Sequence, residues 1–346
     1  MDWFSRSARD LPWRQTRDPY AIWVSEIMLQ QTRAETVRAY WNRWMGALPT
    51  IQAAARAKPE RIHKLWEGLG YYSRVRNLQR AAQIIMAEHD GALPRDYETV
   101  LSLPGVGRYT AGAICSIAFN QPTPILDGNV IRVLSRLFAL TGDPKRNPAR
   151  EIFWTIAGEM VSTAGRQATA ASNACSRSNQ ALMELGATVC LPRQPRCDLC
   201  PVARRCEARR LRRIAEFPQL PSRAPATRRR FAAFIAERGE RFLVRQRPVG
   251  VANAHLWEFP NLELGASTDL HCAAEALLGG RPRLVEPVSC FQHSITRYRI
   301  TLEVYRAEGK WDSRSALGSW LPKTDLRRLA FCAAHKRILG LLANPS

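Results

Sequence analysis

The sequence predicts a mainly α protein with a smaller α/β domain at its C-terminal end. Residues 19–140 contain several stretches with helical patterning, separated by Gly or Pro. A segment rich in Arg and Pro follows, and after it come short runs of β-branched and aromatic residues. The length of 346 residues agrees with this division, because one domain holds roughly 150 residues.

The helical part begins with a clear start signal. Asp18 can cap a helix, and Pro19 fits its first turn. Residues 21–31 are apolar on several sides and predict a buried helix that carries one carboxylate, Glu26. Residues 162–178, rich in Ser, Thr, Ala, Gly and Asn, predict a loop or a poorly ordered insertion. Further helices are expected near 34–45, 50–56, 59–67, 73–89 and 96–102.

The second part of the chain has the pattern of strands. Ten Arg lie within 204–230, against two Glu, and three Pro stiffen the same stretch, which indicates a linker. We therefore divide the chain into a helical domain at 1–208, a basic linker at 209–230 and an α/β or mainly β domain at 231–346. Strands are expected at 231–235, 241–246, 289–293 and 298–305.

The composition excludes several classes of protein. A hydrophobic content of 46% with 23% charged residues excludes a largely disordered chain. No apolar run approaches the roughly 18 residues that cross a bilayer, and the first residues do not form a secretory signal. We therefore expect an intracellular, cytoplasmic protein without a membrane partner.

The charge indicates a polyanionic partner. Lys and Arg number 51 and Asp and Glu number 30, which gives a net charge of +21. Nucleic acid is the commonest partner of such an excess. A basic protein need not bind DNA, so the charge alone leaves both readings open.

Four of the nine cysteines form a cluster. Six, two and five residues separate its successive members: Cys190, Cys197, Cys200 and Cys206. Four thiolates this close can surround one tetrahedral centre, which suits zinc or an iron–sulfur cluster. The spacing does not separate these two, and the alternative is four unrelated buried thiols.

A Gly-rich turn between two expected helices is a second signal. In the segment 103–112, Gly105 and Gly107 allow backbone N–H groups to approach a phosphate at a helix N-terminus. This pattern is typical of a helix-hairpin-helix, which binds the DNA backbone without reading its sequence. The alternative is a plain turn between helices.

Asp127 is a third candidate. It precedes Gly128 and Asn129 and could simply cap the helix that starts near Val130. The functional alternative is a carboxylate that faces Glu26 across a cleft. Two such carboxylates allow one to be protonated while the other stays anionic.

These features follow one another in an order that resembles the endonuclease III superfamily of base-excision DNA glycosylases, and within it the adenine DNA glycosylase (MutY) family. The resemblance covers nearly all of 11–206. It implies a helix-hairpin-helix glycosylase, with a six-helix barrel beside a helical module that holds a [4Fe-4S] cluster. The hairpin would lie at about 99–118 and the iron–sulfur loop at 190–206. The segments that carry the resemblance are 11–14, 23–32, 68–74, 103–112, 125–129, 179–187 and the four cysteines.

The resemblance also implies catalytic roles. Glu26 would be the general acid that protonates adenine, and Asp127 would stabilise the oxocarbenium-like sugar. Tyr109 and Asn129 would orient the two carboxylates. Relatives that also cleave the strand have Lys at the position of Tyr109, and its amine forms a Schiff base with the sugar. We therefore expect a monofunctional glycosylase with little or no lyase activity.

Further positions match those that contact the bases in the family. The flipped adenine would be lined by four residues: Trp13, Arg14, Leu29 and Gln180. The base left opposite would be probed by four others: Gln31, Thr32, Leu69 and Tyr71. Ordinary core packing is the alternative for Trp13, Leu29 and Tyr71, and Tyr72 is expected to be the core aromatic.

The C-terminal domain resembles, more weakly, the MutT (nudix)-like domain that reads 8-oxoguanine in this family. The acidic nudix signature is absent, which argues against a pyrophosphohydrolase. Where the family has Phe-Ser-His, this chain has Ile295-Thr296-Arg297. Thr296 keeps a hydroxyl for the oxidised base, whereas Arg297 is a fixed cation. The change leaves the strength of 8-oxoguanine discrimination open.

The sequence therefore predicts a monomeric glycosylase that removes adenine opposite 8-oxoguanine or guanine in double-stranded DNA. One alternative is a glycosylase of the same fold for another mispair, such as thymine opposite guanine; Gln180 and the C-terminal domain argue against it. Another is a non-catalytic iron–sulfur protein that senses lesions, but a binding protein needs neither carboxylate.

Overall fold

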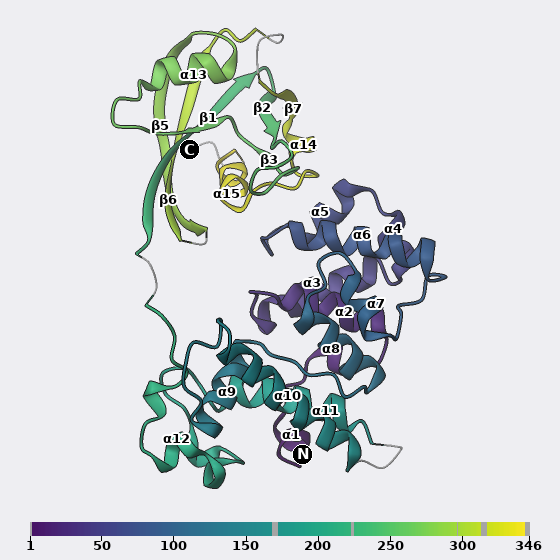
Figure 1. Cartoon of the computed structure of the whole chain (residues 1–346). Helices are drawn as coiled ribbons and strands as arrows, with labels where there is room; N and C mark the ends of the chain where they lie inside the picture. Colours follow the sequence, from purple (N-terminus) through teal and green to yellow (C-terminus); the bar gives the residue numbers. More distant parts are fainter. Residues whose placement is uncertain (1, 168–171, 223–224, 296, 313–316, 343–346) are drawn as a thin grey trace. The chain divides into compact units, whose positions relative to one another are not determined.

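The computed structural model describes residues 2–167, 172–222, 225–295, 297–312 and 317–342 (Figure 1). The chain forms two compact units, and neither is continuous in sequence. One, the helical unit, comprises Met1–Ala57 and Arg76–Ser222. The other, the mixed unit, comprises Lys58–Val75 and Arg223–Ser346. A short helical segment from the first part of the chain thus belongs with the C-terminal domain.

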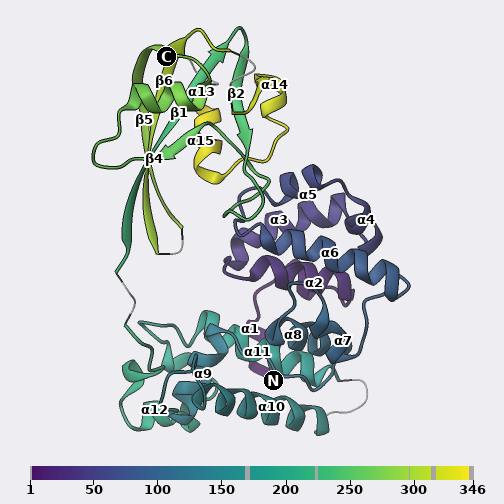
Figure 2. The ribbon, with the colours of Figure 1, turned by 45° about the horizontal axis from the view of Figure 1, so that its top comes forward.

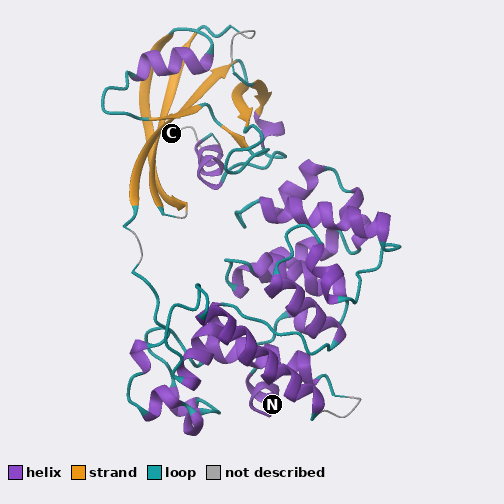
Figure 3. Cartoon of the chain, viewed as in Figure 1, coloured by secondary structure: helices purple, strands orange, loops and turns teal. Residues whose placement is uncertain are grey.

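The first part of the chain is built from helices, as predicted (Figure 3). Short 3₁₀ helices also occur in this part of the chain, at Pro12–Arg14, Cys197–Leu199, Ala203–Arg205 and Ile214–Glu216. The helices are α1 (Asp2–Ser7), α2 (Pro19–Leu29), α3 (Ala34–Ala47), α4 (Ile51–Arg56), α5 (Pro59–Trp66), α6 (Ser73–Glu88), α7 (Tyr97–Ser102), α8 (Arg108–Phe119), α9 (Gly128–Phe138), α10 (Ala149–Arg166), α11 (Ala174–Thr188) and α12 (Glu207–Arg210).

Helix α2 forms as its sequence predicts. The Asp18 carboxylate accepts a hydrogen bond from the Tyr20 amide at 3.0 Å, and Pro19 occupies the first helical position. Every residue from Tyr20 to Met28 is buried. A helix buried on all sides has no polar face, so the one carboxylate that it carries, Glu26, is held away from water.

The prediction of a loop at 162–178 is wrong at both ends. Helix α10 continues to Arg166 and α11 starts at Ala174, while 168–171 lie outside the described residues. Small residues permit close helix packing here: a Cβ on Gly165 would lie 3.0 Å from Cys175 Sγ. The small side chains in this stretch therefore allow α10 and α11 to pack closely, and they do not indicate a loop.

The C-terminal part of the mixed unit is a sheet with helices on both faces. In the described residues the strands follow the order β3-β2-β1-β6-β5, with β4 beside β1 and β7 beside β2. The pairing of β1 with β6 is parallel and the other pairings are antiparallel. Figure 2 shows β1, β5 and β6 side by side. The strands are β1 (Thr227–Arg238), β2 (Arg241–Gln246), β3 (Trp257–Glu258), β4 (Asn261–Glu263), β5 (Pro282–Ile295), β6 (Tyr298–Gly309) and β7 (Ser319–Pro322).

Alternation along β1 separates two hydrophobic cores. Ala233 and Ile235 belong to one core, together with Ile338 of α15 (Ala333–Leu341). Phe234 lies in the other core with Leu278 of α13 (Leu270–Leu278). Since successive strand residues point to opposite faces, these two helices cover opposite faces of the sheet. A further short helix, α14, spans Lys323–Leu326.

All four predicted strands are present, as β1, β2, β5 and β6. The structure adds β3, β4 and β7, which are two to four residues long. Among the described residues, no helix has the length and apolar character needed to cross a membrane.

Candidate active site

The predicted catalytic residues meet at one cavity of about 770 Å³ in the helical unit. Glu26 reaches it from α2, Tyr109 from α8 and Asp127 from the start of α9. Asn129 also lines this cavity. Residues from separate helices thus converge on one space, as the sequence analysis expects.

Glu26 is an ionisable group of the cavity whose pKa is shifted by burial. Its side chain is buried, and burial disfavours the carboxylate, which raises the pKa of Glu26 from its ordinary value of 4.5 to about 7. The hydrogen bond from the Tyr109 hydroxyl, at 3.0 Å to Oε2, opposes this rise. The nearby Asp127 carboxylate reinforces it. A carboxyl group with a pKa near neutrality can donate a proton at physiological pH.

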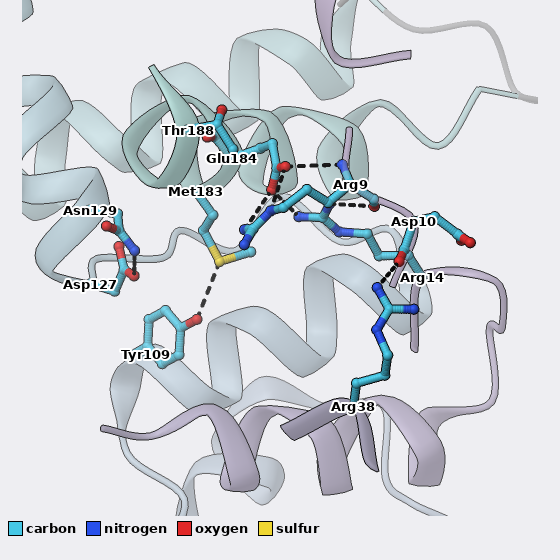
Figure 4. A network of polar contacts seen from close by, with 10 residues as sticks. All are labelled: Arg9, Asp10, Arg14, Arg38, Tyr109, Asp127, Asn129, Met183, Glu184 and Thr188. Atoms are coloured by element: carbon cyan, nitrogen blue, oxygen red, sulfur yellow. Dashed lines mark hydrogen bonds and ion pairs between the residues drawn. The ribbon is translucent and has the colours of Figure 1, made fainter. Parts of the chain in front are cut away.

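Asp127 caps a helix and also lines the cavity. One carboxylate oxygen accepts from the Val130 amide at 2.7 Å and so caps α9. The other accepts from the Asn129 side-chain amide at 3.0 Å (Figure 4). Burial raises the pKa of Asp127, and these two hydrogen bonds to its charged form limit the rise.

Tyr109 connects Glu26 to a second acceptor. Its hydroxyl lies 3.0 Å from Glu26 Oε2. It also lies 3.3 Å from Met183 Sδ, on α11 (Figure 4). One hydroxyl proton cannot be donated to both. When Glu26 is ionised, Tyr109 donates to the carboxylate; when Glu26 is protonated, Glu26 can donate to Tyr109, which then donates to sulfur. The site can therefore accommodate both protonation states of Glu26.

The structure reveals a buried carboxylate that the sequence analysis missed. Glu184 on α11 is fully buried and binds Arg9 through Oε1 and Arg14 through Oε2, each at 2.8 Å (Figure 4). Burial alone would favour its neutral form, but hydrogen bonds from both arginines lower the pKa of Glu184 to about 2. It is the lone acid of the otherwise apolar run 181–187, which is the same signal that drew attention to Glu26.

The residues predicted to line an adenine do lie around this cavity. Gln180 is placed on α11, where its amide donates to Ser176 Oγ at 3.0 Å. Gln31 and Thr32, predicted to probe the opposite base, also line the cavity. The predicted adenine-lining residues are Trp13, Arg14, Leu29 and Gln180.

Leu69 and Tyr71 belong to the mixed unit, in the turn between α5 and α6. Leu69 is buried, whereas Tyr71 is 45% exposed, as a side chain that stacks on DNA must be. Tyr72 is buried, which confirms its expected role as the core aromatic. Thr296 lies outside the described residues, beside Ile295 at the end of β5.

The predicted hairpin consists of α7 and α8 with the Gly-rich turn between them. Gly105 has a φ of 77°, and a Cβ there would lie 2.7 Å from Asn77 Cβ, so the turn needs glycine at this position. Gly107 precedes α8, and a Cβ there would meet nothing within 4 Å. Neighbouring atoms therefore do not require glycine at position 107. Because no atom lies close to a Cβ placed there, the backbone at this position is open to an approaching group.

The four clustered cysteines line one small cavity of about 30 Å³. All four are free thiols. The buried Arg136 guanidinium donates to Cys190 Sγ at 3.4 Å and to the Leu191 carbonyl at 2.7 Å. In the described part of the chain, no group of three or more His, Cys, Asp or Glu is arranged to hold a metal ion. The four thiols nevertheless line one cavity, and their chemistry suits a thiolate-bound cofactor.

Arg132 connects the cysteine segment to the catalytic residues. Its guanidinium donates to the Cys190 carbonyl at 2.6 Å and to Asn129 Oδ1 at 2.9 Å. Asn129 in turn binds Asp127. Helix α11 approaches closely here, since a Cβ on Gly186 would lie 2.6 Å from Asn129 Cβ. The position of Asp127 thus depends on the cysteine segment through two side chains.

Comparisons with known proteins show the class of protein to which this fold belongs. Residues 24–159 match the HhH-GPD superfamily of base excision DNA repair proteins, and residues 231–341 match the NUDIX domain. A solved structure of a thermostable thymine-DNA glycosylase is similar with a TM-score of 0.53 and 28% identity, over 61% of this chain and 93% of that one. The chain therefore has a helix-hairpin-helix glycosylase fold followed by a NUDIX-like domain.

Two relatives show to which family within this class the chain belongs. The chain is 35% identical to the adenine DNA glycosylase of Rattus norvegicus, over 98% of this chain and 76% of that protein. It is 34% identical to the enzyme of the same name from Homo sapiens, over 98% of this chain and 72% of that protein. The chain belongs to the adenine DNA glycosylase family.

Proposed function

We propose that this chain removes adenine from duplex DNA, where it is paired with 8-oxoguanine or guanine, as a monofunctional glycosylase of base excision repair. Membership of the adenine DNA glycosylase family supports the choice of adenine. One observation carries the mechanism: two carboxyl groups, those of the buried Glu26 and the half-buried Asp127, line one cavity, and removal from water raises the pKa of each. This is the arrangement that acid-assisted cleavage of a glycosidic bond requires.

Glu26 is the general acid. Its raised pKa leaves a large share of the group protonated near pH 7. The proton passes to a ring nitrogen of the flipped adenine, the bond to the sugar breaks, and the base leaves as a neutral molecule. Glu26 is then a carboxylate, and Tyr109 stabilises it with a hydrogen bond. In this form it can accept the proton of the attacking water.

Asp127 stabilises the positive charge that develops on the sugar. Bond cleavage leaves positive charge on the sugar, and an anionic carboxylate beside it lowers the energy of the transition state. The Val130 amide and Asn129 favour the ionised form of Asp127. Arg132 holds Asn129 in turn, so Arg132 is a positioning residue.

Tyr109 makes the enzyme monofunctional. A phenol cannot form an imine with the sugar, so strand cleavage by that route is closed. The product is an abasic site in an intact strand.

The four clustered cysteines would hold a [4Fe-4S] cluster, as the family resemblance implies. Bound there, the cluster would supply a rigid centre that fixes the loop of 190–206. Arg136 already binds this loop through the Leu191 carbonyl and Cys190. Gly105 and Gly107 would present backbone amides to a DNA phosphate.

Several residues of the chain would discriminate the base opposite the adenine. Gln31 and Thr32 line the cavity, and the exposed Tyr71 offers a face for stacking. In the C-terminal domain, Thr296 would contact the 8-oxoguanine. The domain acts as a reader and not as a pyrophosphohydrolase, because the acidic nudix signature is absent from the sequence.

A single-turnover assay tests this function. The substrates are two duplexes, one with adenine opposite 8-oxoguanine and one with adenine opposite guanine, each analysed with and without alkali. We expect strand breaks only after alkali, and faster reaction opposite 8-oxoguanine. Breaks without alkali would refute the monofunctional assignment, equal rates would refute the reader, and no adenine release would refute the activity.

A further inference from the structure

A buried glutamate joins two distant segments of the mixed unit. Glu67 directly follows α5 and is only 5% exposed. Its Oε1 accepts from the Phe331 amide at 3.0 Å, and its Oε2 accepts from Lys336 Nζ at 2.7 Å. Phe331 and Lys336 lie more than 260 residues further along the chain, in and just before α15. We call these two hydrogen bonds the Glu67 contact.

The Glu67 contact is charged at neutral pH. Burial would favour the protonated form, but hydrogen bonds from Lys336, Phe331 and Lys64 lower the pKa of Glu67 below its ordinary value. Lys64 Nζ lies 3.0 Å from Oε2 and also donates to the Leu329 carbonyl at 2.8 Å. Charge-assisted hydrogen bonds to a buried carboxylate are stronger than exposed ion pairs.

A second contact lies beside the first. His63, on α5, stacks on His255 of the C-terminal domain, with ring centroids 6.0 Å apart and an interplanar angle of 17°. His63 also meets the buried Tyr72 edge-on, at 6.1 Å. The segment 58–75 is therefore attached to the C-terminal domain at more than one point.

The residue after Glu67 begins the turn that carries Leu69 and Tyr71. This turn has a fixed shape: Gly68, Gly70 and Tyr71 all have positive φ, and Tyr71, at 46°, is a residue type that rarely adopts it. The Arg74 guanidinium donates to the Leu69 carbonyl at 2.9 Å and to the Gly70 carbonyl at 3.1 Å. The turn that carries Tyr71 is therefore bounded by Glu67 at its start and is held by Arg74 at its end.

We propose that Glu67 is a positioning residue for recognition of the opposite base. Through Phe331 and Lys336 it fixes the turn of Leu69 and Tyr71 to the C-terminal domain, so that this turn and that domain move as one body. The inference rests on the proposed function, which assigns base recognition to Tyr71 and to the C-terminal domain. Neither Glu67 nor Lys336 lines the catalytic cavity, so the contact acts on base preference and not on the chemistry of cleavage.

The test compares single-turnover rates on adenine opposite 8-oxoguanine and adenine opposite guanine. Glu67→Gln keeps the shape of the side chain but removes its negative charge. Lys336→Met removes the positive charge and keeps a side chain of similar length. We expect both variants to lower the ratio of the two rates by about tenfold, with the rate opposite guanine changed less than about twofold. Lys336→Arg restores the cation and should restore the ratio.

Arg283→Met is the matched control in the same domain. It removes the exposed ion pair of Arg283 and Glu308, at 3.1 Å, and should leave the ratio unchanged. Wild-type ratios in both Glu67→Gln and Lys336→Met would overturn the proposal. So would an equal loss on both duplexes, because that result indicates general damage to the enzyme.

Hydrogen exchange separates this proposal from the proposed function. The Phe331 amide donates to Glu67, so its exchange should accelerate in Glu67→Ala and stay slow in Arg283→Met. Unchanged exchange at Phe331 would overturn the contact itself. If the wild-type enzyme acts equally on both duplexes, the proposed base preference fails and takes the assigned role of Glu67 with it, while accelerated exchange would still confirm the contact.

Discussion

At the scale of single residues, the proposed chemistry depends on Glu26 and Tyr109. Burial on α2 gives Glu26 a pKa of about 7, and Tyr109 is the hydrogen-bond donor that opposes a further rise. Sequence patterning could locate Glu26, because a single carboxylate in an apolar helix is unusual. It could not reveal that Met183 competes for the Tyr109 hydroxyl, since that contact joins α8 to α11.

Replacing Glu26 with Gln removes the acid but keeps the shape. We expect Glu26→Gln to lower the single-turnover rate of adenine release by about 10²–10⁴-fold, the usual contribution of a general acid, while duplex affinity stays near that of the wild type. Glu88→Gln, on the exposed side of α6, is the control. Retained turnover in Glu26→Gln would remove Glu26 from the mechanism.

Replacing Tyr109 with Phe tests the hydrogen bond. Because this bond stabilises the ionised carboxylate, its loss should raise the pKa of Glu26 above about 7. The proposed mechanism needs the protonated form of Glu26, so the pH above which the rate declines should move upward. A downward shift in a pH–rate profile of Tyr109→Phe would contradict the assignment.

At the scale of elements, α11 holds the N-terminal segment, because Glu184 on α11 binds Arg9 and Arg14.

Secondary structure was predictable wherever capping and apolar periodicity were strong, as at α2. It was not predictable at 162–178, because a run of small residues is compatible both with a loop and with two closely packed helices. The strands β3, β4 and β7 are too short to show alternation.

Breaking the Glu184 pair should destabilise the helical unit. Glu184→Gln leaves Arg9 and Arg14 without a buried counter-charge, at a cost of about 3–5 kcal/mol. Folding lowers the pKa of Glu184 from 4.5 to about 2, so its contribution is complete above about pH 5 and is lost as the pH falls toward 2. The difference in melting temperature between wild type and variant should therefore shrink in acid. A difference that stays constant with pH would contradict this.

The cysteine loop is a separate element with its own test. Cys197→Ser removes one of four thiols around a single cavity, and we expect lower iron and sulfide content together with a lower melting temperature. Cys272→Ser, at an exposed cysteine outside the cluster, is the control and should change neither. Full iron content in Cys197→Ser would exclude this residue as a ligand.

At the scale of the whole molecule, the chain does not divide at a single point. The segment Lys58–Val75 belongs with the C-terminal part, although it lies within the helical sequence. A linear pattern cannot show this, because the contacts of Glu67 and His63 join residues far apart in sequence. The domain limits at 208 and 231 remain a prediction from composition.

The central claim is that a buried, protonated Glu26 drives adenine release. The most direct test is the pH dependence of the single-turnover rate at saturating enzyme, on adenine opposite 8-oxoguanine. Because the acid must be protonated, we expect the rate to decline above about pH 7 and to approach a tenfold fall for each further pH unit. A rate that stays level or rises between about pH 6 and about pH 9 would contradict the account.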